Sequence, residues 1–172
     1  MVEKQTLEIG PLNLGVGTII WKQDKQGRRM FLMGKRTTNP IGFWALPGGS
    51  CDSDNVRVAA AREIREESGI DIQSERLKIV SIDDSEISTI RYLDFGCIVQ
   101  VDNDTDVDLT NASHAHEVAE WRWFYLNGNP EKLSFLSTLD EEIGEHEIFF
   151  PCVQTLKCFL GNKLQLKNNK VA

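Results

Sequence analysis

The chain has 172 residues, of which 41% are hydrophobic and 26% charged, a composition that fits one folded domain over 1–172 and excludes disorder. Its net charge of -7 disfavours nucleic acid as a partner but leaves room for a local basic pocket that takes a small phosphate compound. The four cysteines form no C-x-x-C pair, and neither a signal peptide nor a long apolar run is visible, so we expect a cytoplasmic protein without a zinc site, a disulfide framework or a membrane partner.

Short β-branched and apolar runs in the first half of the chain predict strands. They lie at 14–21, 30–33 and 43–46. Turn residues at 24–27 join the first two runs as a hairpin. Residues 56–68 are predicted to form a helix, with candidate caps at 52–55 before it and Gly69 at its carboxyl end.

The second half repeats the order of strands followed by a helix. Strands are expected at 77–82, 90–101 and 121–125. A solvated acidic loop is predicted at 102–111. Apolar residues at helical spacing predict a second helix at 149–160, and the polar tail after about 162 is expected to be frayed. This order of elements indicates an α/β (α+β) domain with a mixed sheet.

The first predicted helix carries a crowded acidic face. Glu63, Glu66 and Glu67 fall within an arc of about 100°, where like charges cost roughly 0.2–0.5 kcal/mol per pair. Arg62 lies beside Glu66 at i,i+4, whereas Arg65 points away from the carboxylates. A divalent cation would relieve this repulsion, because Mg²⁺ prefers hard oxygen ligands. The alternative is a solvated charged helix face.

A glycine-containing loop leads into this helix. The residues LPGG at 46–49 allow close backbone approach, so the unit from Gly48 to Ile70 can present backbone oxygen and carboxylates to one point.

This unit, GGSCDSDNVRVAAAREIREESGI at 48–70, resembles the Nudix box G-x5-E-x7-R-E-U-x-E-E-x-G-U, in which U is aliphatic. The seven specified positions from Arg62 to Ile70 all match. Counting back, the first box glycine is Gly48 and Asp54 replaces the box glutamate. The loop is one residue shorter than usual.

The resemblance implies a Nudix-type α/β/α sandwich and Mg²⁺-dependent hydrolysis, with Mn²⁺ as an alternative ion. By position, Glu63, Glu66 and Glu67 would be the metal ligands and catalytic residues, with the Gly48 carbonyl as a further ligand. Arg62 would orient the carboxylates by pairing with the box acid.

Residues before the box resemble those of nucleotide-cleaving members. In FLMGKRTTNPIGFWALPGG at 31–49, Lys35 and Arg36 would bind phosphate as charge-assisted donors. The alternative is that they are solvated cations at the end of the hairpin. Phe43 and Trp44 are candidates for stacking a base. One of these two belongs to the core, because neighbouring strand residues face opposite sides.

A further catalytic glutamate is expected between 116 and 124 from the same resemblance. Glu117 is favoured over Glu120 by its spacing, as ligand or general base. His114 and His116 lie nearby and are expected to be exposed loop residues rather than substrate contacts.

The function implied is hydrolysis of a nucleoside diphosphate-linked substrate, with a (d)NTP cleaved to monophosphate and pyrophosphate as the leading expectation. An ADP-ribose or nucleotide-sugar pyrophosphatase is one alternative, and a non-catalytic ligand-sensing Nudix domain is another. The complete acidic triplet disfavours an isomerase of the same fold. The expected partner is a small nucleotide, and a homodimer is left open.

Overall fold

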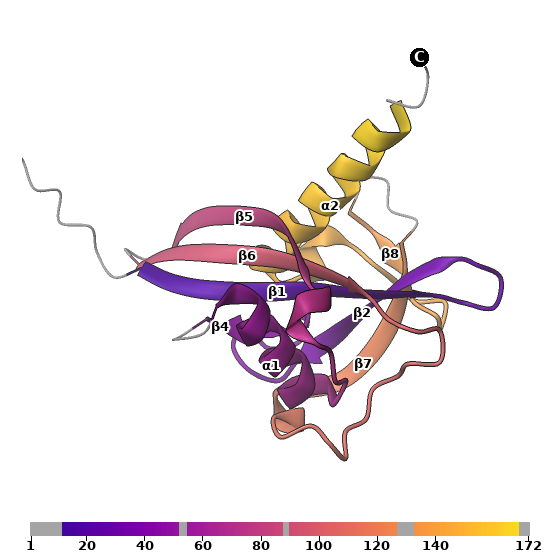
Figure 1. The fold of residues 1–172 in the computed structure, drawn as a ribbon, viewed down its shortest axis with the longest axis horizontal. Coiled ribbons are helices and arrows are strands. Elements are labelled where there is room, and N and C mark those ends of the chain that lie inside the picture. Colours follow the sequence, from indigo (N-terminus) through magenta and orange to yellow (C-terminus); the bar gives the residue numbers. More distant parts are fainter. Residues whose placement is uncertain (1–11, 52–54, 88–89, 127–132, 169–172) are drawn as a thin grey trace, which may run out of the picture.

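The computed structural model describes residues 12–51, 55–87, 90–126 and 133–168 (Figure 1). Its strands are β1 (Leu12–Gln23), β2 (Arg29–Arg36), β3 (Trp44–Ala45), β4 (Gly48–Ser50), β5 (Lys78–Ile87), β6 (Ile90–Gln100), β7 (Val118–Tyr125), β8 (Phe135–Leu136) and β9 (Glu142–Ile143). Its helices are α1 (Val56–Ser68), α2 (Phe150–Asn168) and three 3-10 turns, Ser74–Arg76, Ala115–Glu117 and Glu145–Glu147. Neither α1 nor α2 is long and apolar enough to span a membrane.

Strand β1 is the centre of a mixed sheet. The sheet runs in the order β3-β2-β1-β6-β5, with β7 added to β2 and β4 added to β1. Strand β6 lies parallel to β1 along ten residue pairs, from Leu12 opposite Arg91 to Trp21 opposite Gln100. The other pairs are antiparallel. The expected mixed sheet is confirmed.

The two long helices cover opposite faces of the sheet (Figure 1). Alternate residues of β1 point to the two sides, so Ile20 packs in the cluster that contains Ile64 of α1, and Ile19 packs in the cluster that contains Leu156 of α2. Burial of two apolar faces therefore fixes an α/β/α sandwich, as expected.

Helix α1 begins and ends where the sequence predicts. The Asn55 side chain accepts a hydrogen bond from the Val58 N–H, which satisfies one free donor at the amino end. At the carboxyl end Gly69 has φ 71° and donates its N–H to the Arg65 carbonyl. A side chain would be strained in this backbone conformation, so the glycine fixes the end of the helix.

Two expectations are corrected. Helix α2 does not end near Gly161, as the sequence suggested, but continues to Asn168. The acidic loop at 102–111 is held to the sheet instead of being only solvated, because Lys22 donates to the Thr105 carbonyl and the Trp123 indole donates to Asp106.

Candidate functional site

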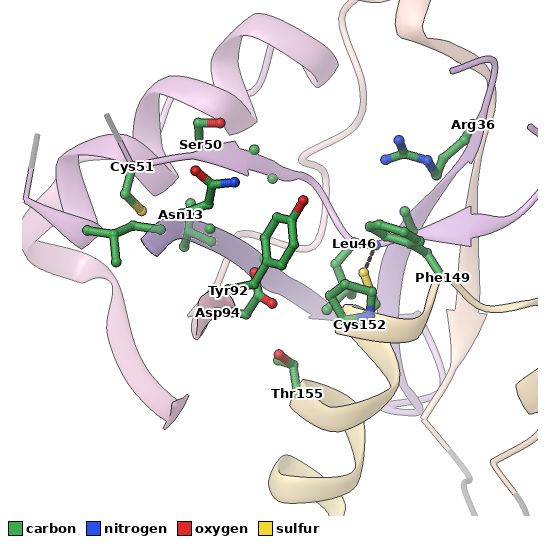
Figure 2. A pocket seen from close by; sticks show the side chains of 18 of the residues that line it. Asn13, Arg36, Leu46, Ser50, Cys51, Tyr92, Asp94, Phe149, Cys152 and Thr155 are labelled. Atoms are coloured by element: carbon green, nitrogen blue, oxygen red, sulfur yellow. Dashed lines mark hydrogen bonds between the residues drawn. The ribbon is translucent and has the colours of Figure 1, made fainter. Parts of the chain in front are cut away.

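A cavity of about 620 Å³ lies between the sheet and the start of α2 (Figure 2). Strand β1 contributes one wall, β4 and β6 contribute others, and Phe149 and Cys152 close the side next to α2. The volume lies within the range of ligand pockets, about 300–1,000 Å³. Arg36, at the end of β2, is the cation that lines it. The cavity therefore combines apolar and polar side chains in similar measure, and its size is that of a small-molecule site.

Strand β4 separates this cavity from the acidic face of α1. Gly48 and Gly49 line the cavity, and the Gly48 N–H donates a hydrogen bond of 3.0 Å to the Oε2 of Glu67. A Cβ on Gly49 would lie 2.6 Å from the Glu63 carboxyl group. Only glycine lets the strand pass this close to the carboxylates. The predicted loop–helix unit thus places the acids directly against β4, whose other side lines the cavity.

The two acids beside β4 are largely buried. Glu63 is 8% exposed and Glu67 is 9% exposed. Burial is the main cause that raises the pKa of Glu67 to about 8; the Glu63 and Glu117 carboxylates act in the same direction, and the Gly48 N–H acts against them. Burial also raises the pKa of Glu63, although Arg62 opposes this. Both carboxylates therefore lack sufficient positive charge around them.

Arg62 joins three parts of the site. Its guanidinium lies 2.8 Å from Glu63 Oε1 and 3.0 Å from Glu66 Oε2, and it donates to the Ser50 carbonyl at 2.8 Å. Arg62 therefore connects two acids of α1 with β4. The expected pairing with Asp54 lies outside the described residues.

Glu117 approaches the acidic face from the turn before β7. It lines a small cavity together with Glu67 and Arg36, and its charge contributes to the raised pKa of Glu67. Glu120 instead forms an ion pair of 2.8 Å with Arg122. The geometry thus favours Glu117 over Glu120, in line with the spacing argument.

His114 holds this turn against α1. Its backbone N–H donates to the Glu66 carbonyl at 2.7 Å, and its Nδ1 lies 3.5 Å from Glu66 Oε2. The side chain is 44% exposed, as expected, but it contacts the acidic face rather than open solvent alone. His116 contributes its carbonyl, which accepts a hydrogen bond from the Thr37 hydroxyl.

The carboxylates have the donor chemistry of a magnesium site. Glu63, Glu66, Glu67 and Glu117 supply hard oxygens, and the raised pKa of Glu67 shows that added positive charge would stabilise its ionised form. Within 12–51, 55–87, 90–126 and 133–168, however, no three His, Cys, Asp or Glu side chains gather closely enough to hold one ion. The residues thus match Mg²⁺ in charge and ligand type but are not gathered around one point, and Arg62 is bonded to two of the acids.

The side chains of Arg36 and Lys35 lie on different sides of β2. The Arg36 guanidinium lies 4.4 Å from the Phe149 ring centroid, donates to Thr38 and the Asn39 carbonyl, and lines the cavity. Lys35 does not line the cavity; its Nζ lies 5.5 Å from the Trp44 ring. Alternation along β2 separates them, so of the two expected phosphate contacts only Arg36 reaches the cavity.

Trp44 is a core residue rather than an exposed platform for a base. It is 2% exposed and packs edge-on against Phe124 at 5.0 Å between ring centroids. The expectation that it stacks substrate is therefore corrected. Phe43 is partly exposed and lines a second, more apolar cavity of about 600 Å³, which shares Phe149 with the first.

Several residues that line the cavity were not predicted from the sequence. They are Asn13, Tyr92, Asp94, Phe149, Cys152 and Thr155. The alternation within the predicted strand at 90–101 could have placed Tyr92 and Asp94 on one face. Their position beside β1 could not have been read from the sequence, because it depends on a parallel pairing across nearly eighty residues.

Comparison with known proteins locates the chain among characterised folds. The model of the NUDIX domain matches residues 11–137. A MutT/nudix family protein from Enterococcus faecalis has a TM-score of 0.70 at 17% identity, covering 91% of this chain and 64% of its own. A C. elegans Ap4A hydrolase in a binary complex has a TM-score of 0.61 at 21% identity, with 89% and 98% covered.

A third similar structure contains a ligand. The NUDIX domain of Shewanella oneidensis NrtR, complexed with ADP ribose, has a TM-score of 0.53 at 18% identity, covering 66% of this chain and 72% of its own. At these identities the structural matches show the fold alone. No curated protein matches the chain significantly.

Proposed function

The chain belongs to the Nudix family, and on this basis we propose that it is a pyrophosphohydrolase that cleaves a nucleoside triphosphate to the monophosphate and pyrophosphate with the help of Mg²⁺. One observation carries the proposal. Gly48 lines the cavity and also donates its N–H to Glu67, so a nucleotide in the cavity would place its phosphates beside the acidic face of α1.

Different residues are proposed to bind the metal ion and the phosphates. Glu63, Glu66 and Glu67 would hold Mg²⁺, with the Gly48 carbonyl as a further ligand, and Arg62 keeps Glu63 and Glu66 in place. The bound ion would neutralise phosphate charge and lower the pKa of a water molecule. Arg36 would donate charge-assisted hydrogen bonds to the phosphate chain from the rim of the cavity.

Glu117 is the proposed general base. Its side chain is 39% exposed, so water can reach it, and it shares a small cavity with Glu67 and Arg36. A carboxylate in that position would accept the proton of the water that attacks phosphorus, while the bond to the bridging oxygen of pyrophosphate breaks. Mn²⁺ would replace Mg²⁺, because it takes the same oxygen ligands.

A second candidate is supported by the cavity that Phe43 lines. Because the two cavities share Phe149, a substrate with a group at each end of its phosphate chain could occupy both. Such substrates include nucleotide sugars, ADP-ribose and dinucleoside polyphosphates. The similarity to an Ap4A hydrolase and to an ADP-ribose complex is compatible with this candidate.

A substrate panel tests the proposal. The full chain is incubated with Mg²⁺ and, separately, with (d)NTPs, ADP-ribose, nucleotide sugars and dinucleoside polyphosphates, and the products are resolved by chromatography. We expect at least one (d)NTP to be turned over fastest, with pyrophosphate as product. If a substrate with a group at each end of its phosphate chain is turned over at least tenfold faster than any (d)NTP, the second candidate replaces the triphosphate proposal. No turnover of any compound would indicate a ligand-sensing domain instead.

A further inference from the structure

One wall of the main cavity contains a carboxylate without a hydrogen-bond donor. Asp94 of β6 is partly buried and lines the cavity beside Asn13 and Tyr92 (Figure 2). Across the part of the chain that the structure describes, no group donates a hydrogen bond to its side chain. The proposed chemistry uses the acids of α1, on the far side of β4, and leaves Asp94 without a role.

The backbone is shaped to accommodate this carboxylate. Asp94 pairs in register with Gly15 of the parallel strand β1, and a Cβ on Gly15 would lie 2.2 Å from Asp94 Oδ1. Any side chain at Gly15 would therefore displace the carboxyl group. Asn13 pairs with Tyr92 two residues earlier on each strand, so the four residues share one face of the sheet.

The surroundings disfavour the charge of Asp94. Burial raises the pKa of this carboxyl group, and the neighbouring Asp83 raises it further. A partly desolvated acceptor to which no protein group donates would gain from a ligand that supplies N–H groups. The same argument excludes phosphate at this point, because two negative groups would repel.

The position of Asp94 indicates which part of a nucleotide it meets. The glycines of β4 and Arg36 line the part of the same cavity where the phosphates are proposed to lie. The rings of Tyr92 and Phe149 lie near Asp94 and Arg36 respectively and could stack on a base (Figure 2). A nucleotide with its phosphates at Gly48 would then place its base toward β6. Asp94 would face the edge of that base.

The bases differ in what they offer a carboxylate, which accepts hydrogen bonds but cannot donate when ionised. Guanine presents two adjacent donors, N1–H and the 2-amino group. Adenine and cytosine present one amino group beside an acceptor nitrogen, and uracil presents one N–H between two carbonyls. Only guanine can satisfy both carboxylate oxygens with neighbouring donors.

Building on the proposed function, we propose that Asp94 accepts hydrogen bonds from N1–H and the 2-amino group of guanine, and that the substrate is a guanine nucleotide. Asn13 and Tyr92 flank this contact. Asp94 is thus the residue that determines base specificity, separate from the residues assigned to hydrolysis.

Binding without turnover tests the assignment. The affinities of GMP, AMP, CMP and UMP are measured by titration calorimetry in metal-free buffer, so the outcome does not depend on hydrolysis. Wild type is expected to bind GMP at least about tenfold more tightly than the other three, within the discrimination that a bidentate base contact provides. Preference for another base, or equal affinities, would overturn the assignment whatever the substrate panel shows.

An exchange of hydrogen-bonding pattern makes the test specific to Asp94. Asp94→Asn replaces one acceptor by a donor, and xanthine replaces the 2-amino donor of guanine by a carbonyl acceptor. The variant should therefore lose its preference for GMP and bind xanthosine monophosphate at least about tenfold more tightly than GMP. Asp84→Asn is the matched control, since Asp84 is 55% exposed, pairs with Arg91 and does not line the cavity.

The remaining outcomes also decide the question. Asp94→Ala, which leaves no hydrogen-bonding group, should bind the four monophosphates with nearly equal affinity. Retention of the GMP preference in both Asp94 variants would overturn the proposal. Loss of discrimination between ribose and deoxyribose in these variants, with base preference unchanged, would show that Asp94 reads the sugar. If the protein hydrolyses triphosphates but shows no preference for guanine, the proposed function is retained and only the role of Asp94 in base recognition is refuted.

Discussion

The backbone N–H of Gly48 donates a hydrogen bond of 3.0 Å to Oε2 of Glu67, and this contact joins the cavity to the acidic helix. A single donor does not offset the burial of Glu67, whose pKa is raised to about 8. The contact therefore holds a carboxylate in an environment that disfavours its charge, next to the place where phosphates are proposed to lie.

The stability of the metal-free protein should depend on pH through Glu67. Between its ordinary pKa of 4.5 and about 8, the folded protein retains a proton that the unfolded chain has released, so stability falls as pH rises through this window. Glu67→Gln removes the penalty. Its advantage over wild type should grow from near zero at pH 4.5 to on the order of a few kcal/mol above pH 8.

Chemical denaturation in EDTA between pH 4.5 and 8.5 measures this difference. Glu142→Gln is the matched control, because Glu142 is exposed on β9. A constant difference between Glu67→Gln and wild type across the range would show that Glu67 titrates normally.

Magnesium should stabilise wild type more than the variant that lacks a carboxylate. A ligand that binds only the folded state stabilises it by RT ln(1 + L/Kd), where L is the free ligand concentration, so at one ligand concentration tighter binding gives a larger rise in melting temperature. At pH 7.5, added Mg²⁺ is expected to raise the melting temperature of wild type and of Glu142→Gln alike, and that of Glu67→Gln by less. Equal shifts in all three proteins would mean that Glu67 is not a ligand.

Glycine at position 48 is required by packing. A Cβ there would lie 2.0 Å from the Val16 carbonyl oxygen, which belongs to the β1 backbone and cannot move freely. Gly48→Ala should cost about 1–3 kcal/mol of stability, as overpacking does. Gly161→Ala, in the middle of α2, is the control. Among the described residues outside the helix's own backbone, no atom lies within 4 Å of a Cβ built on Gly161, so the same change should be neutral or stabilising by up to about 1 kcal/mol. Denaturant unfolding of the two variants would settle the comparison, and an unaffected Gly48→Ala would refute it.

Arg36 and Lys35 are neighbours in sequence with different expected effects. Arg36→Ala removes a donor at the cavity and should lower kcat/KM by about tenfold or more, the effect of losing a charge-assisted hydrogen bond. Lys35→Ala should change it by no more than about threefold, because Lys35 lies over Trp44 outside the cavity. Steady-state kinetics on the best substrate would reveal the contrast. The reverse order of effects would place the phosphates on the other side of β2.

Local patterns predicted the fold well. The bounds of α1 followed from Asn55 and Gly69, because capping is decided by a few residues next to the helix end. The acidic face followed from helical spacing within one element. The end of α2 was misplaced since Gly161 suggested a stop, whereas its backbone has no positive φ and the helix continues.

Long-range pairing limited the prediction of the site. Asp94 lines the cavity only because β6 lies parallel to β1, with Asp94 opposite Gly15, and no local signal reports such a contact. Trp44 was indistinguishable from Phe43 as a stacking residue, because alternation shows that one of two neighbours is buried but not which one. For the same reason the sequence did not show which of Lys35 and Arg36 faces the cavity.

The most direct measurement is kcat for Glu66→Gln and Glu67→Gln at saturating Mg²⁺ on the fastest substrate of the panel. If the acids of α1 hold the catalytic ion, each variant should lose at least about 10²-fold, the lower end of what a positioned electrostatic group contributes. Both should remain folded, because each substitution removes a like-charge contact and leaves an amide oxygen that can accept from Arg62 or from the Gly48 N–H. A kcat near that of wild type in both variants would contradict the assignment of this helix face to metal binding and catalysis.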